Sequence, residues 1–333
     1  MKRRTLLATA AALAMSAAAA FAADDKPAIV FDIGGKFDKS FNESMYNGSE
    51  KFKADTGIQY GEFEIANEAQ REQAIRNFAD QGYSPIIAAG FAQAAAVEKV
   101  AKEYPELKFA IVDMVVDLPN VESIVFKEHE GSYLVGMLAA MASKTGKVGF
   151  VGGMDIPLIR KFACGYAQGV KAVNPDATIF QNMTGDTGAA WNDPVKGGEL
   201  AKAQKSQGAD VIYAAAGGTG IGVLQAAADE GILSIGVDSN QNYLHPGQVL
   251  TSMLKRVDNA VYDAFKAGDG LESGVKVMDL KAGGVDFALD DNNAALITDE
   301  MKAKVEEAKA KIMDGEIMVH DYMADETCPA LTF

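Results

Sequence analysis

The sequence predicts an α/β fold made of two parallel-sheet lobes joined by a hinge. Short apolar runs bounded by Gly, Pro or Asp alternate with longer amphipathic stretches along most of the chain. This alternation is typical of βαβ units with helices on both faces of a sheet. It continues for too long to fit one ordinary sheet, and it restarts after the turn at residues 144–147. A chain of 333 residues can build two lobes that each bury a core.

The first element is a predicted secretory signal peptide over residues 1–22. Three basic residues follow Met1, and the uncharged run after them consists mostly of Ala, Leu and Met. The run is shorter than the stretch of about 20 apolar residues that spans a bilayer. Ala20-Phe21-Ala22 matches the small-x-small pattern before a cleavage site. We expect export rather than a buried N-terminal helix, and a mature chain that begins near Ala23.

The N-terminal lobe is predicted to contain residues 23–127. Its expected strands are Ala28–Asp32, Ile58–Ile65, Pro85–Ala89, Phe109–Asp113 and Val121–Phe126. Amphipathic stretches between them predict helices at Phe41–Lys53, Glu68–Gln81 and Ala92–Tyr104. Most of the strands are therefore separated from the next by a helix, which suits a parallel sheet.

The C-terminal lobe is predicted to contain residues 128–255. Its expected strands are Val148–Gly152, Thr178–Asn182, Val211–Ala216, Ser234–Asp238 and Val249–Leu254, with helices at Gly131–Ser143, Pro194–Gln207 and Gly222–Glu230. A helix at Asp258–Gly268 and a strand at Lys276–Lys281 should return to the first lobe, so that about 256–282 belongs there and about 283–333 to the second. Several crossings of this kind make a hinge with a ligand-trapping cleft.

Charge and cysteine content narrow the class of partner. The chain has 31 basic and 46 acidic residues, and loss of the three basic residues of the signal peptide moves the net charge from −15 to −18. This balance disfavours nucleic acid and anionic membranes as partners. No cysteine lies at the cleavage point, so we expect no lipid anchor. Cys164 and Cys328 could form a disulfide after export, but Cys164 lies in an apolar helical stretch, which favours a buried free thiol.

The ends of the predicted strands carry a set of polar and small residues. Asp32, Asp113 and Asp238 end strands, and Gly90 and Gly217 directly follow strands. Because ligands of open α/β sheets bind beyond the carboxyl ends of the strands, these five residues should converge on the cleft. An aspartate at a strand end is also a common helix N-cap, so each carboxylate has a structural alternative.

Aromatic residues near these positions indicate the shape of the ligand. Phe41 lies in Lys39-Ser40-Phe41-Asn42, and Trp191 is the single tryptophan. Rings could stack on a flat heterocycle, while carboxylates accept hydrogen bonds from sugar hydroxyls or base N–H groups. Packing alone would equally account for Trp191. The combination points to a neutral, polyhydroxylated or heterocyclic ligand.

Patterns that would indicate a cofactor or catalysis find little support. The glycine run at residues 217–222 follows a strand, and Asp238 comes 20 positions after Gly218, but the spacing departs from the G-x-G-x-x-G dinucleotide motif and the run lies late in the chain. The run could instead let amides approach a neutral ligand or tighten a turn. No H-E-x-x-H, Cys-x-x-Cys or G-x-S-x-G occurs. We therefore expect no cofactor, no metal and no enzymatic activity.

Several motifs in the same order resemble the basic membrane protein family of substrate-binding proteins, a group that includes purine nucleoside receptors. The motifs are Asp32–Gly35, Asp38–Asn42, Glu130–Gly136, Lys147–Gly153, Ala216–Gly220, Gly236–Ser239 and Thr251–Arg256. They cover nearly the whole mature chain. The resemblance implies a type I periplasmic-binding-protein fold that delivers nucleosides to an ABC permease.

The resemblance also implies roles for individual residues. Phe41 matches the first stacking position, and Asn42 and Asp113 match polar positions near the base. Asp238 and Lys281 match the pair that holds the ribose hydroxyls from opposite sides, with Lys281 matched through a short motif only. Trp191 stands where members often carry phenylalanine. Many members are lipoproteins, whereas this sequence lacks the lipidation cysteine.

The expected function is therefore that of a monomeric, periplasmic ligand receptor of an ABC importer. A sensor that presents a similar ligand to a membrane receptor is the alternative, and the sequence does not separate the two. A nucleoside hydrolase would need a metal-binding cluster of aspartates near the N-terminus. Asp32 and Asp38, flanked by Lys36 and Lys39, are a poor match for such a cluster.

Overall fold

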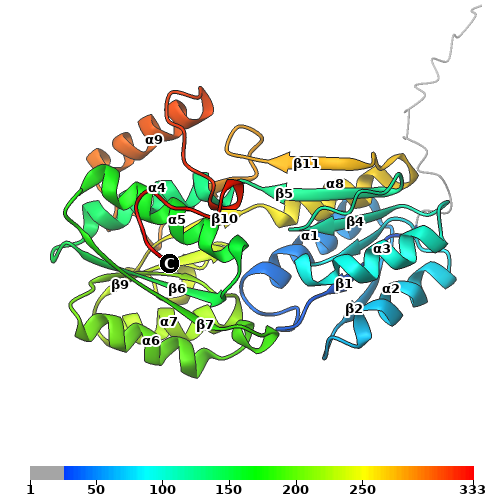
Figure 1. The fold of residues 1–333 in the computed structure, drawn as a ribbon, viewed down its shortest axis with the longest axis horizontal. Helices are drawn as coiled ribbons and strands as arrows, with labels where there is room; N and C mark the ends of the chain where they lie inside the picture. Colours follow the sequence, from blue (N-terminus) through cyan, green and yellow to red (C-terminus); the bar gives the residue numbers. More distant parts are fainter. Residues whose placement is uncertain (1–25) are drawn as a thin grey trace, which may run out of the picture.

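The computed structural model describes residues 26–333, which form two α/β lobes lying side by side (Figure 1). The predicted signal peptide and the expected start near Ala23 fall outside the described residues. In the described part of the chain, no helix combines the length and apolarity needed to cross a membrane.

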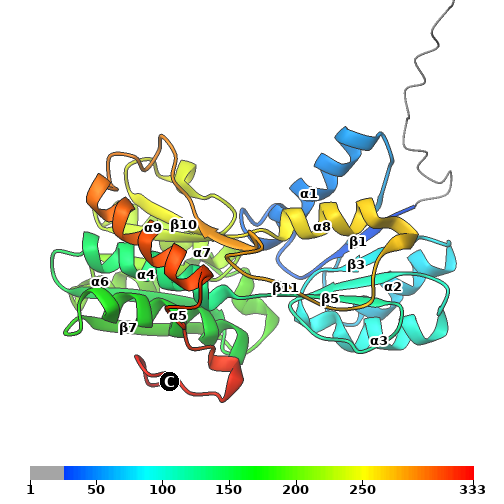
Figure 2. The same cartoon turned by 90° about the horizontal axis from the view of Figure 1, so that it is seen from above.

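The first lobe contains a six-stranded sheet in which all neighbouring strands are parallel, in the order β11-β5-β4-β3-β1-β2. Its strands are β1 (Ala28–Phe31), β2 (Gly61–Glu64), β3 (Ile86–Ala88), β4 (Phe109–Val112), β5 (Val121–Phe126) and β11 (Gly274–Met278). The helices are α1 (Phe41–Thr56), α2 (Gln70–Asp80), α3 (Ala94–Glu103) and α8 (Val257–Ala267). Helices α1 and α8 lie on one face of the sheet, and α2 and α3 lie on the other (Figure 2).

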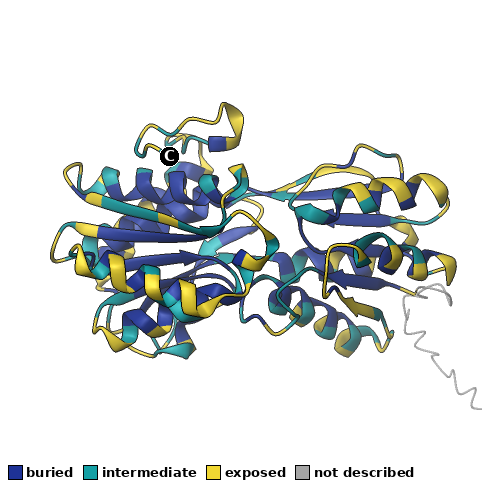
Figure 3. Ribbon diagram, turned by 60° about the horizontal axis from the view of Figure 1, so that its bottom comes forward, coloured by how far each residue is buried: buried dark blue, intermediate teal, exposed yellow. Residues whose placement is uncertain are grey.

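The continuous apolar run of β1 follows from this sandwich. Ile29 and Phe31 belong to the core under α1 and α8, whereas Ala28 and Val30 belong to the core under α2 and α3. Successive side chains of a strand point to opposite faces, so a strand covered on both faces needs apolar residues at every position. Figure 3 shows the result, with buried central strands between helices whose exposed residues lie on their outer sides.

The second lobe contains the sheet β12-β10-β9-β8-β6-β7, parallel except for the antiparallel edge strand β12. Its strands are β6 (Lys147–Met154), β7 (Thr178–Gly185), β8 (Val211–Ala215), β9 (Leu233–Asp238), β10 (Val249–Lys255) and β12 (Val285–Phe287). The helices are α4 (Glu128–Ala142), α5 (Pro157–Val173), α6 (Pro194–Ser206), α7 (Gly218–Asp229) and α9 (Asp299–Met313). The two lobes confirm the predicted α/β architecture of two parallel-sheet lobes.

Three chain segments cross between the lobes and are bonded to one another. The crossings are 126–128, 255–257 and 278–285, at the junction seen in Figure 2. The Lys127 amide donates to the Met278 carbonyl at 3.0 Å, and the Arg256 amide donates to the Gly284 carbonyl at 2.8 Å. The crossings therefore form one connected hinge.

Some elements differ from the sequence prediction. Helices α5 and α9 and strand β12 were not among the predicted elements, and β11 begins and ends earlier than the predicted strand at residues 276–281. The C-terminal residues of that predicted strand instead form a turn, in which the Gly284 amide bonds to the Asp279 carbonyl at 2.7 Å.

The expectation of a free thiol at Cys164 is wrong. Cys164 in α5 and Cys328 form a disulfide whose Cα atoms lie 5.7 Å apart. The chain after α9 folds back along α5, where the Gln168 side chain exchanges two hydrogen bonds with the backbone of His320. An apolar helical environment excludes water from Cys164, but it does not exclude a partner brought in by the distant C-terminal segment.

Candidate functional site

A pocket with about 630 Å³ of empty space, including its open mouth, lies between the two lobes. All five strand-end residues predicted to converge do line it: Asp32, Gly90, Asp113, Gly217 and Asp238. The carboxyl ends of both sheets thus face each other across the cleft.

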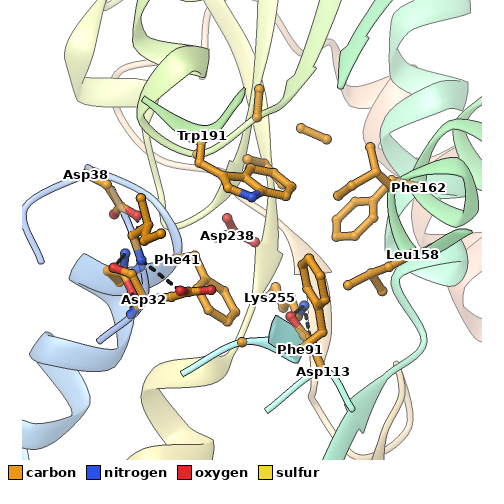
Figure 4. A pocket seen from close by; sticks show the side chains of 18 residues that line it. Asp32, Asp38, Phe41, Phe91, Asp113, Leu158, Phe162, Trp191, Asp238 and Lys255 are labelled. Carbon is orange, nitrogen blue, oxygen red and sulfur yellow. Dashed lines mark hydrogen bonds and ion pairs between the residues drawn. The ribbon is translucent and has the colours of Figure 1, made fainter. Parts of the chain in front are cut away.

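Four aromatic side chains surround the pocket (Figure 4). Phe41 opens α1, and Phe91 opens the short 3₁₀ helix after β3; both belong to the first lobe. Trp191 ends the 3₁₀ helix after β7, and Phe162 lies on α5 in the second lobe. Each lobe therefore presents two rings to the cleft, which suits a flat ligand held between them.

The Trp191 ring occupies space that is open because residue 153 is a glycine. A Cβ atom on Gly153 would come within 2.2 Å of the indole ring, a distance at which atoms overlap. The ring is part-buried, packs on the main core cluster and also lines the pocket. Packing and pocket lining are thus combined in this residue rather than being alternatives.

The loop before α1 holds Asp32 and Asn42 in fixed positions. The Asn42 side chain accepts from the Asp32 amide at 3.2 Å and donates to the Asp32 carbonyl at 3.3 Å. Asp38 accepts from the amides of Ser40, Asn42 and Glu43 at 2.8–3.1 Å, and thereby satisfies the N-terminal N–H groups of α1. The helix-capping role considered for Asp32 falls to Asp38 instead.

Asp32 has its own cationic partner. Arg71 donates to its carboxylate at 3.2 Å, and the Ile33 amide donates at 2.8 Å. Burial raises the pKa of Asp32, and these two donors act against that shift. The carboxylate is thus partly satisfied by the first lobe alone.

Asp113 and Lys255 form an ion pair across the cleft. The Lys255 ammonium group donates to both carboxylate oxygens, at 2.6 and 2.7 Å. Burial disfavours both charges; Asp113, Glu128 and Asp238 nevertheless raise the pKa of Lys255, so it stays cationic. The ammonium group also lies 5.2 Å from the centre of the Phe41 ring. Because Asp113 follows β4 and Lys255 ends β10, this pair joins the two lobes.

Asp238 has a different environment. Its carboxylate accepts a 2.5 Å hydrogen bond from the Ser40 hydroxyl. Burial raises its pKa to about 7, and the Lys255 charge only partly offsets the shift. The backbone φ is 63° at Asp238 and 70° at Asp113. Aspartate tolerates this left-handed conformation better than most residues, which helps to explain why the type occurs at both strand ends.

The structure does not bring Lys281 to the pocket. Lys281 lies exposed in the turn after β11, and the lysine that lines the pocket is Lys255. Residues 279–284, which carry the short motif that resembles the family, form a turn at the hinge and do not line the pocket. The structure therefore does not bring Lys281 together with Asp238, and it places Lys255 in the pocket with Asp238 instead.

Sequence reasoning also missed Phe91, Phe162 and Lys255. Phe91 directly follows Gly90, and Lys255 ends β10, so the strand-end rule would have found both if applied one position further along. Phe162 comes from α5, a helix whose side faces the cleft. No strand-end rule finds a residue of this kind.

The glycine run after β8 serves helix packing and the pocket wall. A Cβ atom on Gly222 would lie 1.8 Å from the Pro194 carbonyl oxygen, so glycine lets α7 approach the start of α6. Gly217 has φ of 55° and lies at the pocket wall beside Trp191. Within residues 26–333, no group of three or more His, Cys, Asp or Glu side chains could hold a metal ion.

Comparisons with known proteins agree with this architecture. Residues 26–322 match the family model described as "ABC transporter substrate-binding protein PnrA-like". The chain is 38% identical to the CD4+ T-cell-stimulating antigen of Listeria monocytogenes (88% of this chain, 87% of the relative) and 37% identical to the ABC transporter nucleoside-binding protein BmpA of Lactococcus lactis (89% of each). A solved solute-binding protein of an ABC transporter system from Aeropyrum pernix is 30% identical, with a TM-score of 0.80 over 89% of this chain and 93% of that one. The chain belongs to the family of PnrA-like substrate-binding proteins of ABC transporters.

Proposed function

We propose that this protein captures a purine nucleoside between its lobes and delivers it to an ABC permease in the inner membrane, without catalysing a reaction. The observation that carries the proposal is the composition of the pocket. Four aromatic rings surround it, and Asp113, Asp238 and Lys255 supply hydrogen-bonding groups in the same pocket. A ligand with one flat apolar part and one hydroxylated part uses both features.

The charges in the pocket favour a nucleoside over a nucleotide. Asp32 and Asp113 are already paired with Arg71 and Lys255, whereas Asp238 accepts from a hydroxyl group. Within residues 26–333 Asp238 forms no ion pair, so a phosphate group near it would face an unpaired carboxylate. Vicinal hydroxyls can instead donate to that carboxylate.

The relatives support the same ligand class. The Lactococcus lactis protein is named for nucleoside binding, and it covers 89% of this chain. We also propose that the mature protein acts in the periplasm as a monomer, a location that the predicted signal peptide supports.

Titration calorimetry with refolded, ligand-free protein tests the proposal. Inosine, guanosine and adenosine should bind, inosine monophosphate should bind much more weakly, and Asp238→Asn should weaken inosine more than hypoxanthine. Loss of a hydrogen bond to a charged group typically costs about 1.5–3 kcal/mol. Equal losses for inosine and hypoxanthine would assign Asp238 to the base or to folding. Failure of every nucleoside to bind would refute the proposed ligand class.

Two further measurements address location and activity. Osmotic shock should release a protein that begins near Ala23, and recovery with the membrane fraction would contradict a free periplasmic form. Inosine incubated with the protein should yield no hypoxanthine above background. Steady release of the base would instead identify a hydrolase.

A further inference from the structure

A chain of buried charged groups extends from the pocket wall into the second lobe. The Lys255 ammonium nitrogen lies 3.0 Å from one carboxylate oxygen of Glu128, and the other Glu128 oxygen lies 2.9 Å from the Lys161 nitrogen. The side chains of Lys255, Glu128 and Lys161 are only 2%, 1% and 8% exposed. Asp113 contacts Lys255 from the other side, so the four side chains form a row in which negative and positive charges alternate. Each buried ion therefore has an oppositely charged neighbour.

Of these four charged side chains, only Asp113 and Lys255 line the pocket. Glu128 is the first residue of α4, and Lys161 lies on α5; neither residue is among those that face the cavity. Lys161 also donates to the Phe126 carbonyl at 2.7 Å, at the end of β5 where the first crossing begins. Lys161, the charged group farthest from the pocket, is therefore bonded to the hinge.

The four groups belong unequally to the two lobes. Asp113 follows β4 of the first lobe, whereas Lys255, Glu128 and Lys161 lie on β10, α4 and α5 of the second. Opening of the cleft would remove Asp113 from Lys255, but Glu128 and Lys161 would stay with it. A lysine on a flexible four-carbon stem would otherwise lose its fixed position in the open state.

We propose that Glu128 and Lys161 are positioning residues that hold the Lys255 ammonium group at the pocket wall in the open protein, so that an arriving ligand meets a preformed donor. The inference rests on the proposed function, because it requires Lys255 to contact the ligand. A preorganised donor lowers the entropic cost of binding. Burial alone would raise the pKa of Glu128, but Lys161 and Lys255 hold it at about 2, so the carboxylate stays charged.

A double-mutant cycle with inosine as the ligand tests this role. Glu128→Gln should weaken inosine binding about tenfold, the lower end of the loss that follows when a residue orienting a metal ligand is removed. In the background of Lys255→Met, Glu128→Gln should cause no further loss. Glu300→Gln, which breaks an exposed 2.8 Å pair with Lys304, is the matched control and should leave affinity unchanged. Additive losses, or unchanged affinity in folded Glu128→Gln, would overturn the proposal.

A second measurement needs no nucleoside. In ¹⁵N NMR of the unliganded protein, the protected ammonium signal of Lys255 should persist in Asp113→Asn and broaden in Glu128→Gln. The opposite result would overturn the positioning role. If Glu128→Gln does not fold, Glu128→Gln/Lys161→Gln removes one charge of each sign and takes its place. Failure of inosine to bind the parent would count against the proposed ligand, whereas the NMR result would still decide the role of Glu128.

Discussion

The Ser40 hydroxyl and the Asp238 carboxylate are joined by a 2.5 Å hydrogen bond between residues 198 positions apart, in different lobes. Two neighbouring bonds reinforce it. The Ser239 hydroxyl donates to the Ser40 carbonyl at 2.9 Å, and the Gln241 side chain donates to the Lys39 carbonyl at 3.0 Å. The loop before α1 is thus tied to the end of β9 by three hydrogen bonds between the lobes.

Ser40→Ala should shift the unliganded protein towards an open form. The substitution removes the bond to Asp238 but leaves the two backbone carbonyl contacts, so we expect a loss of about 1–2 kcal/mol of interlobe stabilisation. Small-angle scattering should show a larger radius of gyration than for the parent, and ligand should restore the compact form. An unchanged scattering profile would mean that the hinge, rather than this bond, sets the closed geometry.

Asp238→Asn should change how stability depends on pH. The folded pKa of about 7 lies above the value of about 3.9 for an unfolded aspartate. Between these values the folded state binds the proton more tightly, so the free energy of unfolding falls as pH rises from about 4 to about 7, by at most about 1.4 kcal/mol per pH unit. Denaturant titrations should show that the free energy of unfolding differs less between pH 5 and pH 8 in Asp238→Asn than in the parent.

Asparagine is the suitable replacement because it also tolerates the φ of 63° at this position. Asp32 has a pKa that burial raises as well, so Asp32→Asn provides a comparison for a carboxylate with a cationic partner. If the parent and Asp238→Asn show the same pH dependence, the carboxylate is hydrated or better paired than its burial suggests.

Cys164→Ala/Cys328→Ala should lower stability without abolishing ligand binding. The disulfide closes a segment of 164 positions, and loss of a native disulfide typically costs about 2–5 kcal/mol. Thermal unfolding should move to a lower temperature in the variant. Dithiothreitol should cause the same shift in the parent and no shift in the variant; an equal shift in both would point to an effect of the reductant elsewhere.

The sequence was sufficient to predict the residues that parallel strands place at a sheet edge. Asp32, Asp113 and Asp238 could be predicted because strand ends are visible as the ends of apolar runs, and all three line one pocket. The rule depends on local pattern and on one general property of parallel sheets. These residues can therefore be predicted even when the relative orientation of the two lobes is unknown.

Contacts that depend on distant segments could not be predicted in this way. The Cys164–Cys328 bond requires the C-terminal chain to return along α5, and the Lys255–Glu128 contact requires two crossings to meet. Helix α5, which is not among the predicted helices, carries Phe162 to the cleft. Nothing in the local pattern states which helix faces the cleft.

Trp191→Phe should retain most of the affinity for a nucleoside, whereas Trp191→Ala should cost about 1–3 kcal/mol, the value typical of base–aromatic stacking. Since Trp191 is the only tryptophan, ligand should change the emission of the parent. Gly153→Ala is an informative companion because its new Cβ would push the indole ring. It should weaken binding while leaving the ring present. If Trp191→Ala binds as tightly as the parent, the ring serves packing alone.

Lys255→Met and Lys281→Met form the sharpest comparison of the two candidate lysines. Lys255 is 2% exposed and contacts Asp113 and Glu128, so its loss leaves two buried carboxylates with one fewer cation, and breaking a buried pair typically costs about 3–5 kcal/mol. Lys281 lies exposed in the turn after β11, where substitutions usually change stability by less than about 0.5 kcal/mol. Lys255→Met should therefore lose both stability and nucleoside affinity, and Lys281→Met should lose neither.

A double variant separates the two effects of Lys255→Met. Adding Asp113→Asn removes one of the two buried carboxylates that lost their cation, so it should recover stability without recovering affinity. Weak binding by Lys281→Met with normal unfolding would instead return the sugar-holding role to Lys281.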